Sequence, residues 1–266
     1  MRKPKVCVLR TAGTNCDKET ASAFALAGAE VGLLHINSLV RGIAELSDYH
    51  ILALPGGFSY GDDVASGKIF ANELRFKLAE QLREFIRQGK LVIGICNGFQ
   101  ILVKSGFLPG NDELKQDTSL IINDSGKFED RWVHLKGNKN RCVWTKGINK
   151  IIYLPVAHGE GKFITLNKQV LNRLKNNGQV VFQYCDGKGK PAGYPDNPNG
   201  AVENIAGICD STGRIFGLMP HPERHVFKEQ HPNFWQRAKG QEADGCRIFQ
   251  NGVDYIKSKI LEGALK

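Results

Sequence analysis

The stretch LVIGICNGFQ, from Leu91 to Gln100, decides the fold of this chain. It sets Cys96 between Gly94 and Gly98, at the point where an apolar run gives way to a polar one. This G-x-C-x-G spacing is that of a nucleophile elbow, a sharp turn that joins a buried strand to a helix. Side chains two residues before and after the cysteine would collide with neighbouring strands, so only glycine fits there. We therefore predict a strand that ends at the elbow and a helix that begins directly after it.

Apolar runs alternate with amphipathic stretches up to the elbow. Buried strands are predicted at Lys5–Leu9, Val31–Ile36 and His50–Pro55. Helices are predicted at Cys16–Ala29, started by Asn15 or Asp17, and at Ala71–Gln88, stopped by Gly89. This β-α-β alternation, with strands apolar on both faces, is typical of a parallel sheet between layers of helices. We predict an α/β protein with an open, mostly parallel central sheet and helices on both faces.

The pattern changes after Gly106 to short alternating segments between Gly and Asn turns. It predicts an antiparallel extension of the same sheet. Its expected strands are Thr118–Ile122, Arg131–Lys136, Arg141–Thr145 and Ile151–Val156. Further strands are expected at Gln179–Cys185, Ile205–Cys209 and Arg214–Met219. Helices are expected near Leu171–Lys175 and from Gly245 to Lys259. We find no repeat and no domain linker, and therefore predict one domain over residues 1–266, with 225–266 as a C-terminal tail and helix.

Composition excludes several classes of protein. Hydrophobic residues make up 41% of the 266 residues, and no apolar run approaches the ~20 residues of a membrane span. Arg10 leaves the first apolar stretch too short for the core of a signal peptide. The seven cysteines are odd in number and include no C-x-x-C pair, which argues against disulfides and structural zinc. We expect a cytoplasmic protein without a metal ion.

The formal net charge of +9 raises the question of an anionic partner such as a nucleic acid. Between Lys127 and Lys150 the cations are interleaved with Trp132 and Trp144, a mixture that can bind single strands. The alternation in RWVHLKG instead indicates an exposed strand, and most Lys and Arg residues are scattered. We favour a solvated basic surface and predict no binding of nucleic acid.

A cysteine nucleophile needs a base and a group that orients the base. GLMPHPERH, residues 217–225, places His221 and Glu223 after a predicted strand, at the carboxyl edge of the sheet where ligands bind. We predict a triad of Cys96, His221 and Glu223, with His158 as the rival base. The start of the following helix favours the thiolate form of Cys96. The alternative is a buried, inert cysteine in a tight turn.

The segment GGFSYGDDVASGKIF, residues 56–70, resembles a phosphate-binding loop but does not have the residue spacing of that motif. Asp62 stands where that motif needs glycine, and Ile69 replaces the Ser or Thr that would bind magnesium. We interpret Gly57 as part of a turn whose N–H, together with that of Asn97, forms an oxyanion hole. Such a hole stabilises the tetrahedral intermediate of acyl chemistry.

Four segments together resemble one enzyme family: PGGFSYGDDVASGKIFANEL, GICNGFQIL, VAHGEGKF and NPNGAVENIAGICDSTGRIFGLMPHPERH. They look like the glutaminase components of phosphoribosylformylglycinamidine synthase, which are class I, triad-type glutamine amidotransferases with a flavodoxin-like sheet. The resemblance runs from about Val6 to Arg224. The tail after Arg224 is more similar to the large fused form of the synthase than to the shorter free-standing subunit.

The resemblance implies that a Cys96 thiolate attacks the side-chain amide of L-glutamine. Ammonia leaves, and a thioester forms on the sulfur. A large synthetase subunit, which binds formylglycinamide ribonucleotide, ATP and magnesium, would use the ammonia in purine biosynthesis. No cofactor is expected in this chain, and the need for an additional small subunit stays open. The residues carried over are Gly57 and Asn97 for the oxyanion, and Gln100, His158 and Glu160 for the bound glutamine.

Two other hypotheses remain. The same fold and triad would also suit an amidotransferase subunit that serves a different synthetase. A non-catalytic binding module, in which Cys96 senses oxidation, would need no base beside the sulfur. The position of His221 relative to Cys96 distinguishes this module from the enzymes.

Overall fold

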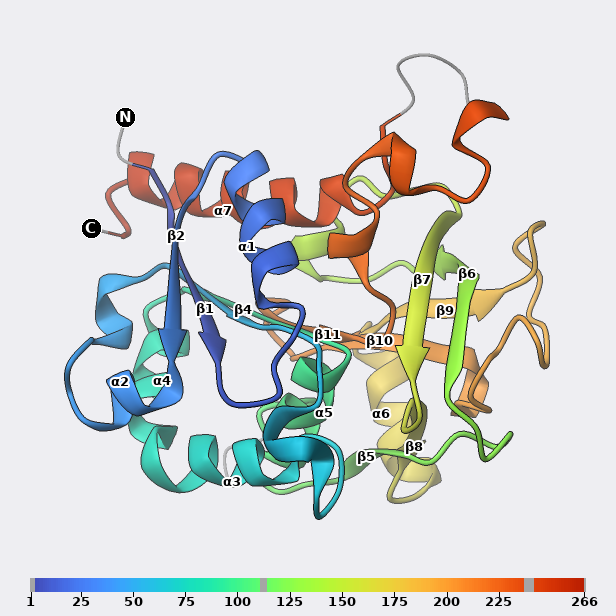
Figure 1. Cartoon of the computed structure of the whole chain (residues 1–266), viewed down its shortest axis with the longest axis horizontal. Coiled ribbons are helices and arrows are strands. Elements are labelled where there is room, and N and C mark those ends of the chain that lie inside the picture. The colour runs from blue at the N-terminus through green and yellow to red at the C-terminus, as the bar shows by residue number, and fades with distance from the viewer. Residues whose placement is uncertain (1–2, 111–113, 237–241, 266) are drawn as a thin grey trace.

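The computed structural model describes residues 3–110, 114–236 and 242–265. Its centre is a nine-stranded sheet in the order β2-β1-β3-β4-β11-β10-β9-β6-β7 (Figure 1). The first five strands in this order run parallel to one another. They are β2 (Glu30–His35), β1 (Lys5–Arg10), β3 (Ile51–Leu54), β4 (Leu91–Ile95) and β11 (Ile215–Leu218).

The remaining four strands form an antiparallel extension of the same sheet. They are β10 (Ile205–Cys209), β9 (Val180–Cys185), β6 (Glu129–Gly137) and β7 (Ile152–His158). The predicted fold class is therefore confirmed. The two halves meet where β11 pairs with β4 on one side and β10 on the other, so the residues after β4 and β11 leave the sheet side by side.

Helices cover both faces of the sheet (Figure 1). One face carries α1 (Asp17–Leu26) and the C-terminal α7 (Cys246–Leu261). The other carries α3 (Lys68–Lys77), α4 (Ala79–Arg87), α5 (Asn97–Lys104) and α6 (Lys168–Asn176), and the short α2 (Ile36–Val40) follows β2. The strands β3, β4, β10 and β11 are buried along their whole length, as a sheet covered on both faces requires.

Aromatic side chains join the C-terminal helix to this core. Phe24 of α1 meets Phe249 of α7 edge to face, with ring centroids 5.0 Å apart, and also contacts the edge of Trp144. All three rings are fully buried, and burying each Phe contributes about 1.5–3 kcal/mol to stability. The apolar core is continuous from Val6 to Leu265, so α7 of the predicted tail packs on the same core as the sheet.

Two predicted strands are wrong as assigned. The segment that begins at Thr118 forms β5 (Thr118–Ile121), which pairs with β8 (Lys162–Thr165) in a separate two-stranded sheet rather than in the central one. The segment Arg141–Thr145 contains a 3-10 turn at Val143–Thr145. Its Trp144 turns inward, and the indole N–H donates to the carbonyl of Arg214 at 3.1 Å. Burial of this ring overrides the alternating pattern.

The helix predictions also need two corrections. The single helix expected over Ala71–Gln88 breaks at Leu78, whose φ of −125° and ψ of 5° separate α3 from α4. No glycine or proline marks this break, and Leu78 is as buried as the leucines inside the two helices. Helix α1 is capped at Cys16 without a side-chain hydrogen bond, and not by Asn15 or Asp17. Asp17 instead pairs with Arg10 at 3.3 Å.

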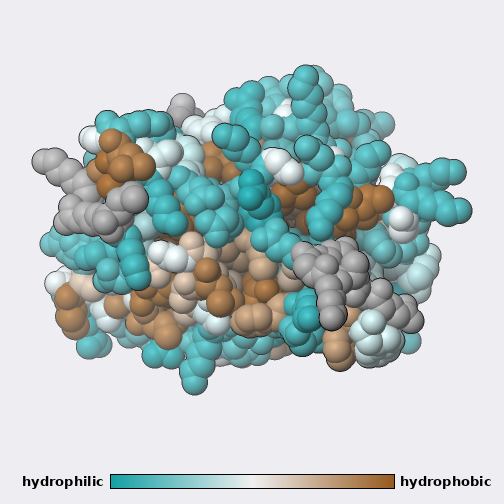
Figure 2. Space-filling view, turned by 90° about the horizontal axis from the view of Figure 1, so that it is seen from above, coloured by the Kyte–Doolittle hydropathy of each residue, from teal (hydrophilic) through white to brown (hydrophobic). Residues whose placement is uncertain are grey.

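The surface mixes hydrophilic residues with smaller hydrophobic patches, as the view from above shows (Figure 2). Among the described residues, no helix has both the length and the apolar character needed to cross a membrane.

Candidate active site

Cys96 lies in a strained turn between β4 and α5. Its φ of 51° and ψ of −106° are rare for a residue with a side chain. A Cβ on Gly98 would lie 1.8 Å from the carbonyl oxygen of Leu54 in β3, and one on Gly94 would lie 2.5 Å from that of Gly98. The two glycines are therefore required by close contact with a neighbouring strand and with the first turn of α5. The strain presents the sulfur at the carboxyl edge of the sheet.

His221 and Glu223 follow β11 at the same edge. The backbone N–H of His221 donates to the carbonyl of Pro155 in β7 at 2.8 Å, and its Nδ1 lies 2.6 Å from Oε1 of Glu223. Both side chains are about 1% exposed. The carboxylate fixes Nδ1 as the protonated nitrogen, which leaves Nε2 available as a base. Among the described residues, Nε2 has no hydrogen-bond partner within bonding distance.

Gly56 brings the imidazole and the nucleophile together. A Cβ on this residue would lie 2.8 Å from Cε1 of His221 and 3.4 Å from Cβ of Cys96. Burial alone would lower the pKa of His221, but the Glu223 carboxylate and the nearby Cys96 outweigh it and raise this pKa well above its ordinary value. The arrangement therefore favours an imidazolium at His221.

His158, the rival base, is enclosed by amides. Its Nδ1 lies 3.2 Å from Oδ1 of Asn123, and its Nε2 lies 3.4 Å from Nδ2 of Asn199. Burial, with the nearby charge of His221, lowers the pKa of His158 to about 3, so its imidazole is neutral at physiological pH. Because both ring nitrogens are occupied, the geometry favours His221 as the base.

Gly57 and Asn97 supply backbone N–H groups near the sulfur. Gly57 has a φ of +135°, and a Cβ there would lie 2.7 Å from the backbone nitrogen of Asn15 and 2.8 Å from the carbonyl oxygen of Gly13. Asn97 is the first residue of α5, where a helix leaves its N–H groups without an internal partner. Within the described chain, neither N–H donates to a protein acceptor. Both are free to donate to an oxyanion.

Gln100 and Glu160 are tied into a buried polar network. The Gln100 amide donates to the carbonyl of Glu160 at 2.6 Å and accepts from Nδ2 of Asn97 at 3.0 Å. The Glu160 carboxylate accepts from the backbone N–H of Ser66 and from Lys104, both at 3.3 Å. Direct contact of Gln100, His158 or Glu160 with a glutamine substrate stays a prediction.

This network also anchors the loop that follows β3. Asp62 accepts from the N–H of Gly67 at 3.1 Å and from Nδ2 of Asn97 at 3.3 Å. Lys104, which the sequence pattern did not single out, donates to the carbonyl of Ser66 at 2.6 Å. A loop that borders the proposed oxyanion hole is thus fixed to α5 by buried polar groups.

Sequence analysis also missed the surroundings of His221 on the α1 side. Cys16, the residue before α1, is buried beside this imidazole, and Arg224 donates to its sulfur at 3.1 Å. The only signal was a cysteine in the polar turn GTNCD, residues 13–17, which carries no recognisable spacing.

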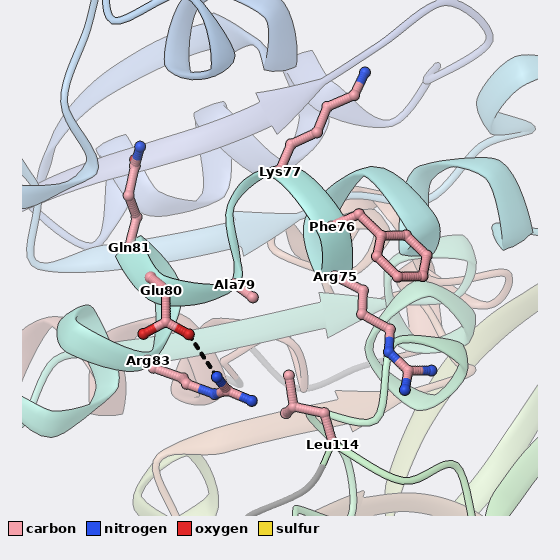
Figure 3. Close-up of a pocket in the computed structure, with 8 residues that line it drawn as sticks. All are labelled: Arg75, Phe76, Lys77, Ala79, Glu80, Gln81, Arg83 and Leu114. Carbon is pink, nitrogen blue, oxygen red and sulfur yellow. Dashed lines mark hydrogen bonds and ion pairs between the residues drawn. The ribbon is translucent and has the colours of Figure 1, made fainter.

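A hollow of about 510 Å³ near α3 and α4 lies away from these groups (Figure 3). Arg83 pairs there with Glu80, and Phe76 and Leu114 face the same space. None of the residues that line it is a candidate site residue. Cys96 itself is only 5% exposed.

Comparisons with known proteins show the family of this chain. The chain matches the family of CobB/CobQ-like glutamine amidotransferase domains over residues 3–256, and it belongs to that family of glutamine amidotransferases. The curated relatives have a more specific name than the family: they are called phosphoribosylformylglycinamidine synthase subunit PurQ. The protein of Methanococcus maripaludis is 47% identical over 95% of this chain and 97% of its own length, and that of Dehalococcoides mccartyi is 49% identical over 97% and 99%.

A solved structure of a related chain has the same fold. A chain in the structure of PurLQS from Thermotoga maritima superposes with a TM-score of 0.73 at 33% identity, covering 96% of this chain and all of that chain. The alignments with the curated relatives include nearly the whole chain, so separate subunits of this length, with the tail, occur in the family.

Proposed function

We propose that this chain is the glutaminase component of phosphoribosylformylglycinamidine synthase, which hydrolyses glutamine and delivers ammonia to a synthetase subunit. The observation that carries the chemistry is the strained Cys96 beside a His221 imidazole held by Glu223. The identity of the pathway is supported by the curated relatives, which are PurQ subunits at up to 49% identity over nearly the full length.

In the first half of the reaction, the Cys96 thiolate attacks the side-chain amide carbon of glutamine. The carbonyl electron pair moves to oxygen, and the N–H groups of Gly57 and Asn97 donate to the oxyanion. When the carbonyl re-forms, the C–N bond breaks and the imidazolium of His221 gives its proton to the leaving nitrogen. The products of this half are ammonia and a glutamyl thioester on Cys96.

In the second half, neutral His221 takes a proton from water through Nε2, and the resulting hydroxide attacks the thioester. The C–S bond breaks, glutamate leaves and the thiolate returns with its imidazolium. Glu223 keeps the imidazole in the productive tautomer and balances its charge in both halves. Its burial, 1% exposed, protects this ion pair from exchange with water.

The expected partner is a larger synthetase subunit that binds formylglycinamide ribonucleotide, ATP and magnesium. The T. maritima structure is of a PurLQS assembly, and this supports a complex with a synthetase and a small subunit for this chain also. No cofactor is proposed for the chain itself, since the triad and the two N–H groups supply every proton and charge that the hydrolysis needs.

Reconstitution with the synthetase subunits of the same organism tests the assignment. We expect glutamine-dependent formation of formylglycinamidine ribonucleotide only when this chain is present. When the synthetase of another amidotransferase pathway replaces these subunits, we expect no glutamine-dependent product. Activity with that other synthetase, and not with the first, would favour the alternative that the chain serves a different pathway. Glutamine turnover that is absent in every complex would favour the non-catalytic module.

A further inference from the structure

Three polar side chains follow one face of α5, the helix that begins directly after Cys96. Asn97, Gln100 and Lys104 are spaced three and then four residues apart, which brings them to the same side of the helix. All three residues are buried, with at most 6% of each exposed. The proposed reaction uses the backbone N–H of Asn97 and assigns Gln100 to the substrate, but it gives Lys104 no part.

This face of α5 binds the loop that follows β3. The ammonium of Lys104 donates to the carbonyl of Ser66 at 2.6 Å, and the Ser66 hydroxyl donates to Asp62 at 2.9 Å. The next residue, Gly67, has a φ of +72°, and a Cβ there would lie 2.9 Å from Cγ1 of Ile101. The loop therefore lies directly against α5, and Lys104 is one of the groups that hold it there.

The same face also binds the segment after β7, which carries Glu160. The Gln100 amide donates to the backbone carbonyl of Glu160 at 2.6 Å. The carboxylate of Glu160 lies 3.3 Å from the Lys104 ammonium, and both of its oxygens lie 3.3 Å from the backbone nitrogen of Ser66. Lys104 thus connects two segments that are far apart in the sequence, through Ser66 on one and Glu160 on the other.

The pair of Lys104 and Glu160 is unequally buried. The Lys104 side chain is 6% exposed and that of Glu160 is 24% exposed, so the ammonium is enclosed while the carboxylate keeps an open side. Burial lowers the pKa of Lys104, and the Glu160 carboxylate opposes this shift. A carboxylate that is held from within and open on the outside is suited to bind a cationic group, such as the α-ammonium of glutamine.

We propose that Lys104 is a positioning residue for glutamine, which acts by fixing the Glu160 carboxylate in the orientation that the substrate meets. This inference rests on the proposed function and on contact between Glu160 and the substrate. Removal of one partner of a buried ion pair leaves the other without compensation, so Glu160 would lose its fixed place. Because the α-ammonium is remote from the reacting amide, the loss should weaken binding of the ground state and the transition state alike.

The variant Lys104→Met removes the charge and keeps most of the length of the side chain. In the reconstituted complex, we expect KM for glutamine to rise roughly 10-fold or more, because hydrogen bonds to charged groups are the stronger ones, while kcat changes less than about 2-fold. Synthesis from ammonium checks that the complex still assembles. Lys90→Met is the matched control: Lys90 is also 6% exposed and donates to the carbonyl of Ser47 at 2.7 Å, but it precedes β4, at the opposite end of this strand from Cys96.

A double variant tests whether Lys104 acts through Glu160. Glu160→Gln should itself raise KM, and the further addition of Lys104→Met should raise it by less than about 2-fold, since the two residues form one unit. Urea unfolding shows whether each variant folds. If Lys104→Met does not fold, Lys104→Gln, which keeps an N–H for the Ser66 carbonyl, takes its place in the same comparison.

Three results would overturn the proposal. They are an unchanged KM in the Lys104 variant, an equal rise of KM in Lys90→Met, and a further rise of roughly 10-fold when Lys104→Met is added to Glu160→Gln. None of them bears on the glutaminase assignment, which is tested by the wild-type complex alone. Absence of synthesis from glutamine in that complex would contradict the assignment before any Lys104 variant is measured.

Discussion

Nδ1 of His221 lies 2.6 Å from Oε1 of Glu223, and both residues are about 1% exposed. Two residues apart in the sequence, they form a buried pair because the chain turns through a single 3-10 turn, Pro222–Arg224, directly after β11. The pair fixes which nitrogen carries the proton, and it holds the imidazole beside Gly56 and the elbow. The remaining chemistry depends on this one contact.

Removing the charge of Glu223 should therefore cost activity without removing the base. Glu223→Gln keeps the size of the side chain but no longer favours the productive tautomer, and we expect a loss in kcat of roughly 100-fold or more. His221→Ala should be more severe, and the double variant should be no worse than His221→Ala alone. Glutaminase assays of the complex measure both. Additive losses would show that the two residues do not act as a unit.

His158 should give the protein a pH-dependent stability. Burial lowers its pKa from the ordinary 6.5 to about 3 in the folded chain. Between these values the unfolded state binds a proton that the folded state does not, so the free energy of unfolding falls as the pH falls, by up to about 1.4 kcal/mol per pH unit. Since the pKa of His221 is raised, that residue stays protonated in the folded chain in this window, and its contribution is the same in two proteins that differ only at His158.

Urea unfolding at pH 6.5 and pH 5 measures this slope. Wild-type protein should lose roughly 2 kcal/mol more across this interval than His158→Gln, because only the histidine can take up a proton on unfolding. Comparison of slopes removes the general destabilisation that the substitution itself causes. Equal slopes in the two proteins would mean that His158 is not buried in its neutral form.

Gly57 should tolerate no side chain. Gly57→Ala places a Cβ 2.7 Å from the backbone nitrogen of Asn15, at a φ of +135° that alanine rarely adopts. We expect lower stability and a loss of glutamine-dependent turnover, since the N–H aimed at the oxyanion must shift. Gly126→Ala is the matched control: its φ is +65° and a Cβ there meets nothing within 4 Å. Similar losses of turnover in both variants would contradict the assignment of Gly57 to the oxyanion hole.

The isolated chain should be a poor glutaminase. Cys96 is 5% exposed, and the loop that borders it is held to α5 through Asp62 and Lys104. Docking of the synthetase with its substrates bound should supply contacts that favour an open, productive arrangement. Steady-state glutaminase assays of the chain, alone and with saturating partner, test this. Equal turnover in the two conditions would contradict activation by docking.

The elbow and the sheet were predictable because their signals are local. Two glycines around Cys96 and four apolar runs define four of the five parallel strands, and the change of period after Gly106 marks the antiparallel extension. The break at Leu78 was not predictable, since an apolar residue there continues the helical pattern. Trp144 was assigned to a strand because the alternating pattern around it does not show that its ring turns inward.

The residues of the site also fall into those that the sequence could predict and those that it could not. His221 and Glu223 could be predicted because their spacing after a strand determines where both side chains lie. Cys16 could not, since its contact with His221 joins residues on α1 and after β11 and depends on how that helix packs. Networks such as Lys104 with Glu160 and Ser66 likewise connect segments far apart in the sequence, and no local pattern encodes them.

The central claim is that Cys96 is the nucleophile of a glutaminase that supplies ammonia to a synthetase. The most direct measurement compares two nitrogen sources in the reconstituted complex carrying Cys96→Ala. The account predicts that glutamine-dependent synthesis is abolished while synthesis from added ammonium proceeds at close to the wild-type rate, since ammonia bypasses the thioester. Loss of both activities to the same extent, or retention of the glutamine-dependent one, would contradict it.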